Sequence, residues 1–426
     1  MTQRIVIVGG GAGGLPLASA LGKRLGRRKK AEITLVDSCA SHIWKPRFHE
    51  VATGAIDADL DAVDYRAHAR RNHYHFELGR MQGLDREKQQ VILAPHVDAD
   101  GEEGLPERRL DYDYVVIAIG SRGNDFNTPG VRDHCMFLDS RQQADRFHER
   151  FLALCLRANH LAEQMSIAIV GGGATGVELA AEIHHAVALL KLYGHEQLDR
   201  SRLKVDVIEA GPSLLPALKP ELAATVKKEL EKMGVTVHLD TRVKSADDKG
   251  FVTADEQRID ADILVWAAGI KAPEMLADLG LSHNRINQIN VAPTLLSDDP
   301  SVFVIGDCCA CEMGENKFIP PRAQSAQQMA KHTAKNLCRL IDGKPLLDFR
   351  YRDHGSLVSL SNYTAVGSLM GNLRSGSVFV EGWLARMMYI SLYRMHQVAL
   401  YGWLRTGMLL LAGRFNRLWR PRLKLH

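Results

Sequence analysis

Short apolar runs recur along this chain, and glycine follows many of them directly. The runs at residues 5–8 and 167–170 each lead into a glycine-rich turn and then into a stretch with helical spacing. Continuous apolar runs of this length are typical of parallel strands covered on both faces. Further runs of this kind lie at residues 33–36, 114–119, 205–208, 263–267 and 302–305. The pattern predicts an α/β chain built on parallel sheets.

The first glycine turn has the spacing of a dinucleotide-binding loop. Gly9, Gly11 and Gly14 follow strand 5–8, a helix is expected at about 13–25, and strand 33–36 ends in Asp37. In such a unit the glycines allow a tight turn, close approach of a pyrophosphate and close packing of the helix, while the acid accepts hydrogen bonds from an adenosine ribose. We therefore predict a nucleotide site that Gly120 helps to close, because this glycine ends strand 114–119.

The same plan occurs a second time, which indicates a second nucleotide. The predicted NADH-binding residues of this copy are Gly171, Gly173, Gly176, Glu209 and Gly269. A carboxylate at the position of Glu209 favours the free 2′-hydroxyl of NADH and repels a 2′-phosphate.

This copy precedes strand 302–305, which ends in Gly306 and Asp307. If strand 302–305 completes the first fold, the second dinucleotide fold is inserted in the first. The predicted domains are residues 1–130 and 291–350 for the first nucleotide, 131–290 for NADH and 351–426 for a C-terminal region.

Cysteine usage limits the chemistry available to the chain. The seven cysteines form no periodic framework, and the sequence starts without a secretory pattern, which predicts a reducing, cytoplasmic compartment. Apart from Cys308 and Cys311 in the run CCAC (308–311), no two cysteines have C-x-x-C spacing. Cys308, Cys309 and Cys311 stand too close together to surround a tetrahedral metal, so we expect no metal site. Electrons should pass directly to a small diffusible acceptor.

Two nucleotide folds followed by the element VFVIGD (302–307) resemble the two-dinucleotide-fold flavoprotein oxidoreductases. That resemblance implies FAD in the first fold, NAD(P)H in the inserted fold, and Asp307 on the ribityl chain of the flavin. Two dinucleotides held together suggest hydride transfer from nicotinamide to flavin.

A second resemblance, which covers nearly the whole chain, is more specific. The segments AQSAQQ (323–328), IWKPRFHEVATG (43–54), NDFNTPGV (124–131) and VWAAGIKAP (265–273) are similar to the bacterial branch of the type II NADH dehydrogenases, which are non-pumping NADH:quinone oxidoreductases. The resemblance implies that Gln324 and Gln328 orient a quinone and that Ala326 lies at the flavin. Gln327 departs from the family, where histidine is frequent, so the resemblance implies no proton relay at that position.

Glu178, two residues after the last glycine of the second motif, has two readings. One is compensation of the helix dipole, worth roughly 0.3 to 1 kcal/mol in the first turn. The other comes from the resemblance, which implies a role in quinone interaction or proton delivery. Quinone reduction requires protons, and Glu178 is the first candidate to supply them.

The C-terminal residues 383–425 combine aromatic and aliphatic residues with eight Lys or Arg, and no Asp or Glu follows Glu381. No stretch is long and apolar enough for a spanning helix. Amphipathic helices of this composition suit a bilayer surface. We expect peripheral attachment to the cytoplasmic face of a bacterial inner membrane, with no nucleic-acid binding. The alternative is a helical pair that packs in the core or forms a homodimer.

Three other functions remain open from the sequence. A soluble NAD(P)H-dependent flavoprotein reductase of a redox protein would not need the C-terminal region. A sulfide:quinone oxidoreductase should carry a cysteine pair and lack the second nucleotide site. An NADH-sensing binding protein would show no turnover.

Overall fold

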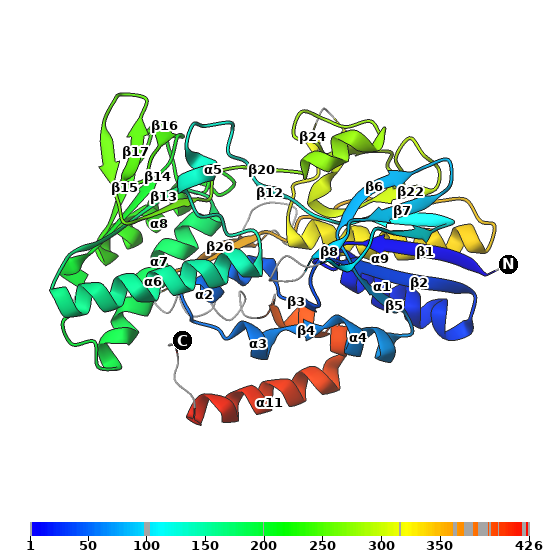
Figure 1. Cartoon of the computed structure of the whole chain (residues 1–426), viewed down its shortest axis with the longest axis horizontal. Helices are drawn as coiled ribbons and strands as arrows, with labels where there is room; N and C mark the ends of the chain where they lie inside the picture. Colours follow the sequence, from blue (N-terminus) through cyan, green and yellow to red (C-terminus); the bar gives the residue numbers. More distant parts are fainter. Residues whose placement is uncertain are drawn as a thin grey trace. The chain divides into compact units, whose positions relative to one another are not determined.

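The computed structural model is shown in Figure 1 and describes residues 2–97, 103–198, 200–314, 317–360, 364–369, 378–381, 391, 393–398, 400–419 and 423–424. The chain divides into two compact units. Unit 1 comprises Met1–Lys45, Ala62–Arg122 and Ile270–Arg352, and unit 2 comprises Pro46–Asp61, Gly123–Gly269 and Asp353–His426. The predicted domain limits depend on which ligand each segment binds, and they stay a prediction.

Unit 1 is built on a parallel sheet whose strands, in spatial order, are β22 (Val302–Val304), β11 (Tyr114–Ile117), β1 (Gln3–Val8), β2 (Ala31–Asp37) and β5 (His75–Leu78). Ile5, Val6, Ile7 and Val8 are buried, as expected for a central strand covered on both faces. Ile5 pairs with Ile33 of β2 on one side and with Tyr114 of β11 on the other. Since β22 pairs with β11, the predicted completion of the first sheet by a strand after the second fold is confirmed.

Helices α1 (Gly14–Arg24) and α9 (Ala323–Ile341) of unit 1 pack against each other. The other elements of unit 1 are β3 (Ser41–His42), β4 (Val63–Asp64), α4 (Tyr65–Asn72), β6 (Met81–Asp85), β7 (Gln90–Leu93), β8 (His96–Val97), β9 (Glu103–Leu105), β10 (Arg108–Asp111), β20 (Ile270–Lys271), β21 (Ile289–Val291), β23 (Cys309–Gly314), β24 (Lys317–Phe318) and short 3-10 helices at Gly26–Arg28, Glu274–Leu279 and Gly306–Cys308. β12 (Arg122–Gly123) lies where the chain leaves unit 1 for unit 2.

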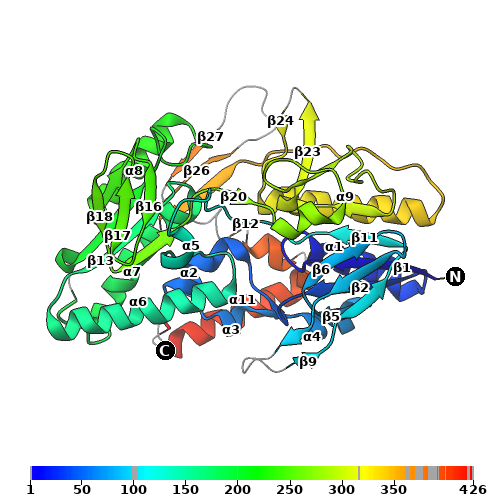
Figure 2. The same ribbon diagram turned by 45° about the horizontal axis from the view of Figure 1, so that its top comes forward.

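Unit 2 contains the second parallel sheet, in the order β15 (Val235–His238), β14 (Leu203–Ile208), β13 (Met165–Val170) and β19 (Ile263–Trp266). A separate antiparallel layer in the same unit consists of β16 (Val243–Ala246), β17 (Gly250–Thr253) and β18 (Arg258–Asp260) (Figure 2). Phe251 of this layer packs in one buried cluster with Ala168 and Trp266 of the parallel sheet. The predicted repeat of the dinucleotide plan is therefore present as a second sheet with its own core.

Several helices of unit 2 pack against one another. α2 (Phe48–Ala52), which lies in the Pro46–Asp61 segment, packs against both α6 (Arg141–Leu161) and α7 (Ala174–Leu192). The other elements are α3 (Ala58–Asp61), α5 (Val131–His134), α8 (Pro220–Met233) and short 3-10 helices at Lys45–Arg47, which leads into this segment, and Arg200–Arg202.

The C-terminal part of unit 2 contains β25 (Ser356–Leu360), β26 (Thr364–Leu369), β27 (Val378–Glu381) and α11 (Trp403–Trp419). β25 and β26 pair antiparallel, with Ser356 opposite Ser368. Much of the predicted membrane region, including residues 383–390, lies outside the described residues. Within the described part of the chain, no helix has the length and hydropathy to cross a bilayer.

Candidate functional site

The first glycine turn is shaped by close backbone packing. Gly9 has a φ of 101°, and its N–H donates to the carbonyl of Val36 at 2.8 Å. A Cβ on Gly14 would lie 1.8 Å from the Gly9 carbonyl oxygen, so only glycine lets α1 begin this close to β1. At Gly11, an added Cβ would meet no atom within 4 Å. The turn is thus rigid and has open space where the sequence predicts a pyrophosphate.

Asp37 ends β2 beside this turn and is partly buried. Its carboxylate accepts hydrogen bonds from the N–H of Gly10 at 2.6 Å and of Cys39 at 2.8 Å. Desolvation raises the pKa of Asp37, and the hydrogen bonds from Gly10 and Cys39 oppose this rise. The hydroxyl of Tyr65 donates to the Gly10 carbonyl at 2.9 Å. Tyr65, on α4, was not predicted from the sequence, because nothing in its own neighbourhood links it to the turn.

Asp307 follows β22 in the same unit. Its carboxylate accepts a hydrogen bond from the hydroxyl of Ser121 at 2.8 Å, and its carbonyl accepts one from the Gln288 amide at 2.8 Å. Lys45 donates to the Ser121 carbonyl at 2.8 Å. Desolvation raises the pKa of Asp307, while Ser121 and the Lys45 charge lower it. A desolvated carboxylate of this kind favours further hydroxyl donors.

The first residues of α9 lie close to both the first glycine turn and the loop of Asp307. A Cβ on Gly306 would lie 3.4 Å from the Cβ of Ala326, and a Cβ on Gly13 would lie 3.6 Å from it. Ala326 therefore lies next to both the first glycine turn and the loop of Asp307. A Cβ on Gly120 would meet no atom within 4 Å, so there is open space at the end of β11 as well. This rigid turn, the two carboxylates and the open space fit a flavin dinucleotide.

The glutamines of α9 differ in their surroundings. The Gln328 side chain donates to the Arg352 carbonyl at 2.8 Å and accepts from the Arg352 N–H at 3.1 Å. This two-way contact fixes the chain at Arg352 and uses one of the two N–H donors of the Gln328 amide. Gln324 and Gln327 are half-buried on the same helix.

The second glycine turn has the same individual hydrogen bonds as the first. Gly171 has a φ of 116°, and its N–H donates to the Ile208 carbonyl at 2.8 Å. Glu209 accepts from the N–H of Gly172 at 2.6 Å and of Gly211 at 2.8 Å, as Asp37 does in unit 1. Gly173 has open space around it, and a Cβ on Gly176 would lie 2.0 Å from the Gly171 carbonyl oxygen.

One further contact near the second turn was not predicted from the sequence. Gly269, at the end of β19, has a φ of 63°, and a Cβ there would lie 2.4 Å from the ring of Phe126. Phe126 is itself exposed, and its left-handed backbone conformation carries no sequence signal.

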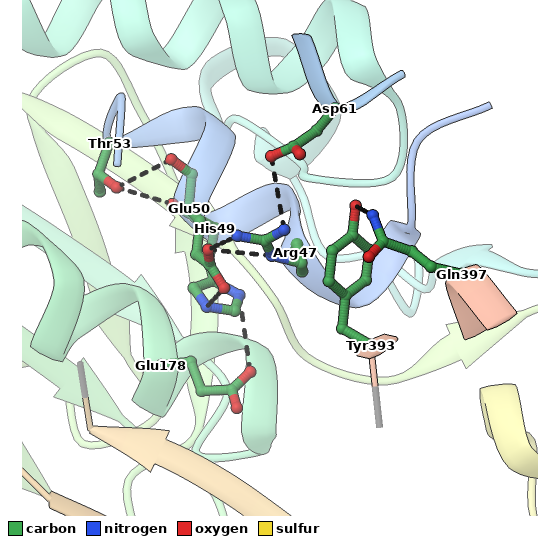
Figure 3. A network of polar contacts seen from close by, with 8 residues as sticks. All are labelled: Arg47, His49, Glu50, Thr53, Asp61, Glu178, Tyr393 and Gln397. Carbon is green, nitrogen blue, oxygen red and sulfur yellow. Dashed lines mark hydrogen bonds and ion pairs between the residues drawn. The ribbon is translucent and has the colours of Figure 1, made fainter. Parts of the chain in front are cut away.

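Glu178 is buried in α7 and does not cap the helix. α7 begins at Ala174 and has no acidic residue in its first turn, so the dipole reading of Glu178 is wrong. Its carboxylate lies 3.6 Å from Nδ1 of His49, a buried side chain of α2 (Figure 3). Burial lowers the pKa of His49 to about 4, with Glu50 raising and Arg47 lowering it. His49 is therefore a neutral imidazole near neutral pH.

Arg47 lies at the centre of the same network (Figure 3). Its guanidinium donates to one oxygen of Glu50 at 3.0 and 2.5 Å and lies 3.6 Å from Asp61. The Tyr393 ring lies 4.5 Å from the guanidinium carbon, which is a cation–π distance. Burial opposes the charge of Arg47, but Glu50 raises its pKa above the ordinary value. Arg47 and His49 both lie in the segment 43–54 that resembles the family, although no role was assigned to them from the sequence.

Comparison with known proteins decides the family. Residues 3–330 match the family model of the pyridine nucleotide-disulphide oxidoreductases. A type II NADH:quinone oxidoreductase of Haemophilus influenzae is 47% identical over 443 aligned positions, which cover all of both chains. The chain belongs to the type II NADH:quinone oxidoreductases.

A more distant relative and two solved structures are also similar to this chain. The Staphylococcus saprophyticus type II NADH:quinone oxidoreductase is 27% identical, with 87% of this chain and 90% of that protein covered. The structure of NDH2 from Plasmodium falciparum in complex with NADH has a TM-score of 0.83 at 17% identity, with both chains fully covered. The sulfide:quinone oxidoreductase of Aquifex aeolicus has a TM-score of 0.72 at 17% identity, covering 94% of this chain and 92% of that one. These two likenesses show a shared fold.

In this type II NADH:quinone oxidoreductase the cysteines are free thiols. Cys308, Cys309 and Cys311 are buried, and burial raises the pKa of Cys308 to about 12 and of Cys311 to about 11. Such thiols are poor nucleophiles and poor metal ligands. Within the described residues, no cluster of His, Cys, Asp or Glu has the arrangement of a metal site.

The C-terminal helix of this type II NADH:quinone oxidoreductase presents an apolar face. Leu404, Met408, Leu411 and Phe415 of α11 follow helical spacing and are all exposed. Because these side chains are exposed, the helix does not pack in the core of a single chain, as one alternative had predicted. The C-terminal end also returns to unit 2, where the N–H of Lys424 donates to the Gly54 carbonyl at 2.8 Å.

Proposed function

We propose that this chain is an FAD-dependent NADH:quinone oxidoreductase that works without proton pumping at a bacterial membrane surface. The observation that carries the proposal is the repeat of one hydrogen-bonded plan. Gly10 with Asp37 and Gly172 with Glu209 each place an acid against a glycine turn. Two such turns in one chain favour two dinucleotides, and the family membership supports this reading.

The residues of unit 1 would hold FAD. The open turn at Gly11 would receive the pyrophosphate, Asp37 the adenosine ribose, and Asp307 the hydroxyls of the ribityl chain. Gly120, Gly306 and Ala326 would face the flavin. When bound, FAD supplies the two-electron chemistry that amino-acid side chains lack.

The second turn would hold NADH. Gly173 has open space for a pyrophosphate. Glu209 retains acceptor capacity for the ribose hydroxyls and would repel the 2′-phosphate of NADPH.

The quinone would be served by Gln324, Gln328 and Glu178. Neutral amides orient a carbonyl by donating hydrogen bonds, and a buried carboxyl group supplies a proton to a developing quinol. The exposed apolar face of α11 supports peripheral attachment to lipid, with the cytoplasmic face of the inner membrane as the expected site. A homodimer stays a prediction.

The direct test is an anaerobic titration of the purified protein. The protein should be yellow, lose its visible absorbance when NADH is added, and regain it when a short-chain quinone follows. A protein that is colourless after supply of FAD, or that keeps its absorbance with NADH, would contradict the proposed function.

A further inference from the structure

The overall reaction requires one proton from water, if the proposed function holds. NADH gives a hydride, which carries two electrons and one proton, whereas a quinol needs two electrons and two protons. The balance is NADH + H⁺ + quinone → NAD⁺ + quinol. Since the proposed donor Glu178 is buried, its proton must be replaced along some path from solvent.

We propose that His49 is the relay that returns this proton from Glu50 to Glu178. The two nitrogens of its ring face the two carboxyl groups, with Nδ1 3.6 Å from Glu178 and Nε2 3.9 Å from Glu50 (Figure 3). Both separations are longer than a direct hydrogen bond. Transfer therefore needs a small side-chain rotation or a bridging water.

Because the His49 ring is neutral, the groups around it decide which of its two nitrogens carries the proton. A neutral imidazole has one N–H and one bare nitrogen, so it can donate to only one of the two carboxyl groups at a time. Glu50 accepts two N–H bonds from Arg47, as a carboxylate does, and favours the N–H of His49 on Nε2. The bare Nδ1 then faces Glu178, and it can accept a hydrogen bond from Glu178 when that carboxyl group is protonated.

The relay step balances as follows. Glu178 gives its proton to the quinone oxygen and becomes a carboxylate. The His49 ring then turns so that its Nε2–H faces Glu178, gives that proton to the carboxylate, and takes a proton at the bare Nδ1 from the side of Glu50 and solvent. The imidazole returns to its first tautomer by rotation or by a further exchange with water, and no redox change occurs at any of these groups.

The exposure of the side chains rises from the buried pair, Glu178 and His49, toward Glu50 and Asp61. His49 is 4% and Glu178 8% exposed, Glu50 is 16% and Asp61 is 37% exposed. Glu50 is thus the first group in contact with water on the path that leads outward from His49. Arg47 holds Glu50 in place, and the Tyr393 ring covers the guanidinium. The charged groups that face His49 from its own segment and from α7 are Arg47, Glu50 and Glu178.

The test is His49→Gln, with His148→Gln as the matched control. A glutamine fills much of the same space and forms hydrogen bonds but cannot exchange a proton between two nitrogens. His148 is also a buried histidine of unit 2, and it packs against Gly54 in the segment that carries His49. Rapid-mixing experiments would follow flavin reduction by NADH and flavin reoxidation by a short-chain quinone separately, over a pH series and in H₂O and D₂O.

For His49→Gln, we expect reduction by NADH to stay fast and reoxidation by quinone to slow by about 100-fold, the usual scale for loss of general acid–base assistance. The slow step should gain a larger solvent isotope effect, and added imidazole should restore part of the rate. His148→Gln should behave as the parent.

Two results would overturn the relay. One is an unchanged rate, pH profile and isotope effect of reoxidation in His49→Gln. The other is equal slowing in both variants, which would indicate packing alone. If His49→Gln does not fold, Glu50→Gln decides, because an unchanged reoxidation rate there would also refute the path. Failure of the parent flavin to react with NADH would instead refute the proposed function.

Discussion

Glu209 and Asp37 hold equivalent positions in the two sheets, and each accepts an N–H from the residue after the first glycine of its turn. A backbone donor fixes the direction of each carboxylate, so its remaining lone pairs point to a defined place. The choice between NADH and NADPH should therefore depend on one side chain in unit 2.

Replacing Glu209 should change that choice. In Glu209→Gln combined with Ala210→Arg, the negative charge is lost and a cation is added at an exposed position beside it. We expect the ratio of kcat/KM for NADPH to that for NADH to rise by about 100-fold, which corresponds to about 2.8 kcal/mol. Steady-state kinetics with both nucleotides measure this ratio. Flavin content should not change, because Asp37 is untouched, and an unaltered ratio would refute the assignment of Glu209.

Sequence patterns identify the carboxylates but not the groups that hold them. Asp37, Glu209 and Asp307 were predicted because each directly follows a recognisable strand. Tyr65 reaches the first turn from α4, which has no nucleotide motif, and Ser121 reaches Asp307 from the position after Gly120, where only the glycine was predicted. Their contacts arise from tertiary packing, which leaves no periodic trace in the sequence.

At the scale of elements, periodicity predicted the strands well and the short segments poorly. β1 and β13 are buried on both faces and give continuous apolar runs. The helix α2 has only five residues, which is too few for a helical period. The arrangement of His49 opposite Glu178 was therefore found only in the structure.

The apolar face of α11 should decide attachment to membranes. In Leu404→Gln, Met408→Gln and Leu411→Gln combined, three side chains that would each gain about 1.5–3 kcal/mol in lipid are removed. Cosedimentation with phosphatidylcholine–phosphatidylglycerol vesicles should show a partition coefficient at least about 100-fold lower, given about 1.4 kcal/mol for each tenfold change.

Leu192→Gln provides the matched control, because Leu192 is 78% exposed at the end of α7 and Leu404 is 80% exposed. The control should sediment like the parent, and reduction of a short-chain quinone should be the same in all three proteins. Equal sedimentation of the triple variant and the parent would exclude α11 as the attachment site.

For the whole molecule, buried histidines predict a loss of stability in mild acid. Burial lowers the pKa of both His42 and His49 from 6.5 to about 4. The unfolded chain therefore takes up protons below about pH 6.5 while the folded chain does not, so stability is present above that pH and is lost as pH falls toward 4. At pH 5 the loss should reach about 2 kcal/mol for each histidine.

Thermal unfolding between pH 7 and pH 5 measures this effect. Asp37 and Asp307 act in the opposite direction, because their raised pKa values favour the folded state as they become protonated. The combined variant His42→Gln and His49→Gln should show a smaller fall in melting temperature than the parent over this range. A fall of the same size in both proteins would rule out the histidines as its cause.

The Pro46–Asp61 segment has a consequence for synthesis of the chain. Its flanking strands β3 and β4 pair with each other in unit 1, whereas the segment itself packs in unit 2 against α6 and α7. One contact of the segment is the hydrogen bond that the N–H of Lys424 donates to the carbonyl of Gly54. It joins two residues that lie far apart in the sequence. During synthesis the chain can therefore complete its first sheet only after β22 has left the ribosome, and the contact at Gly54 can form only after Lys424 has left it.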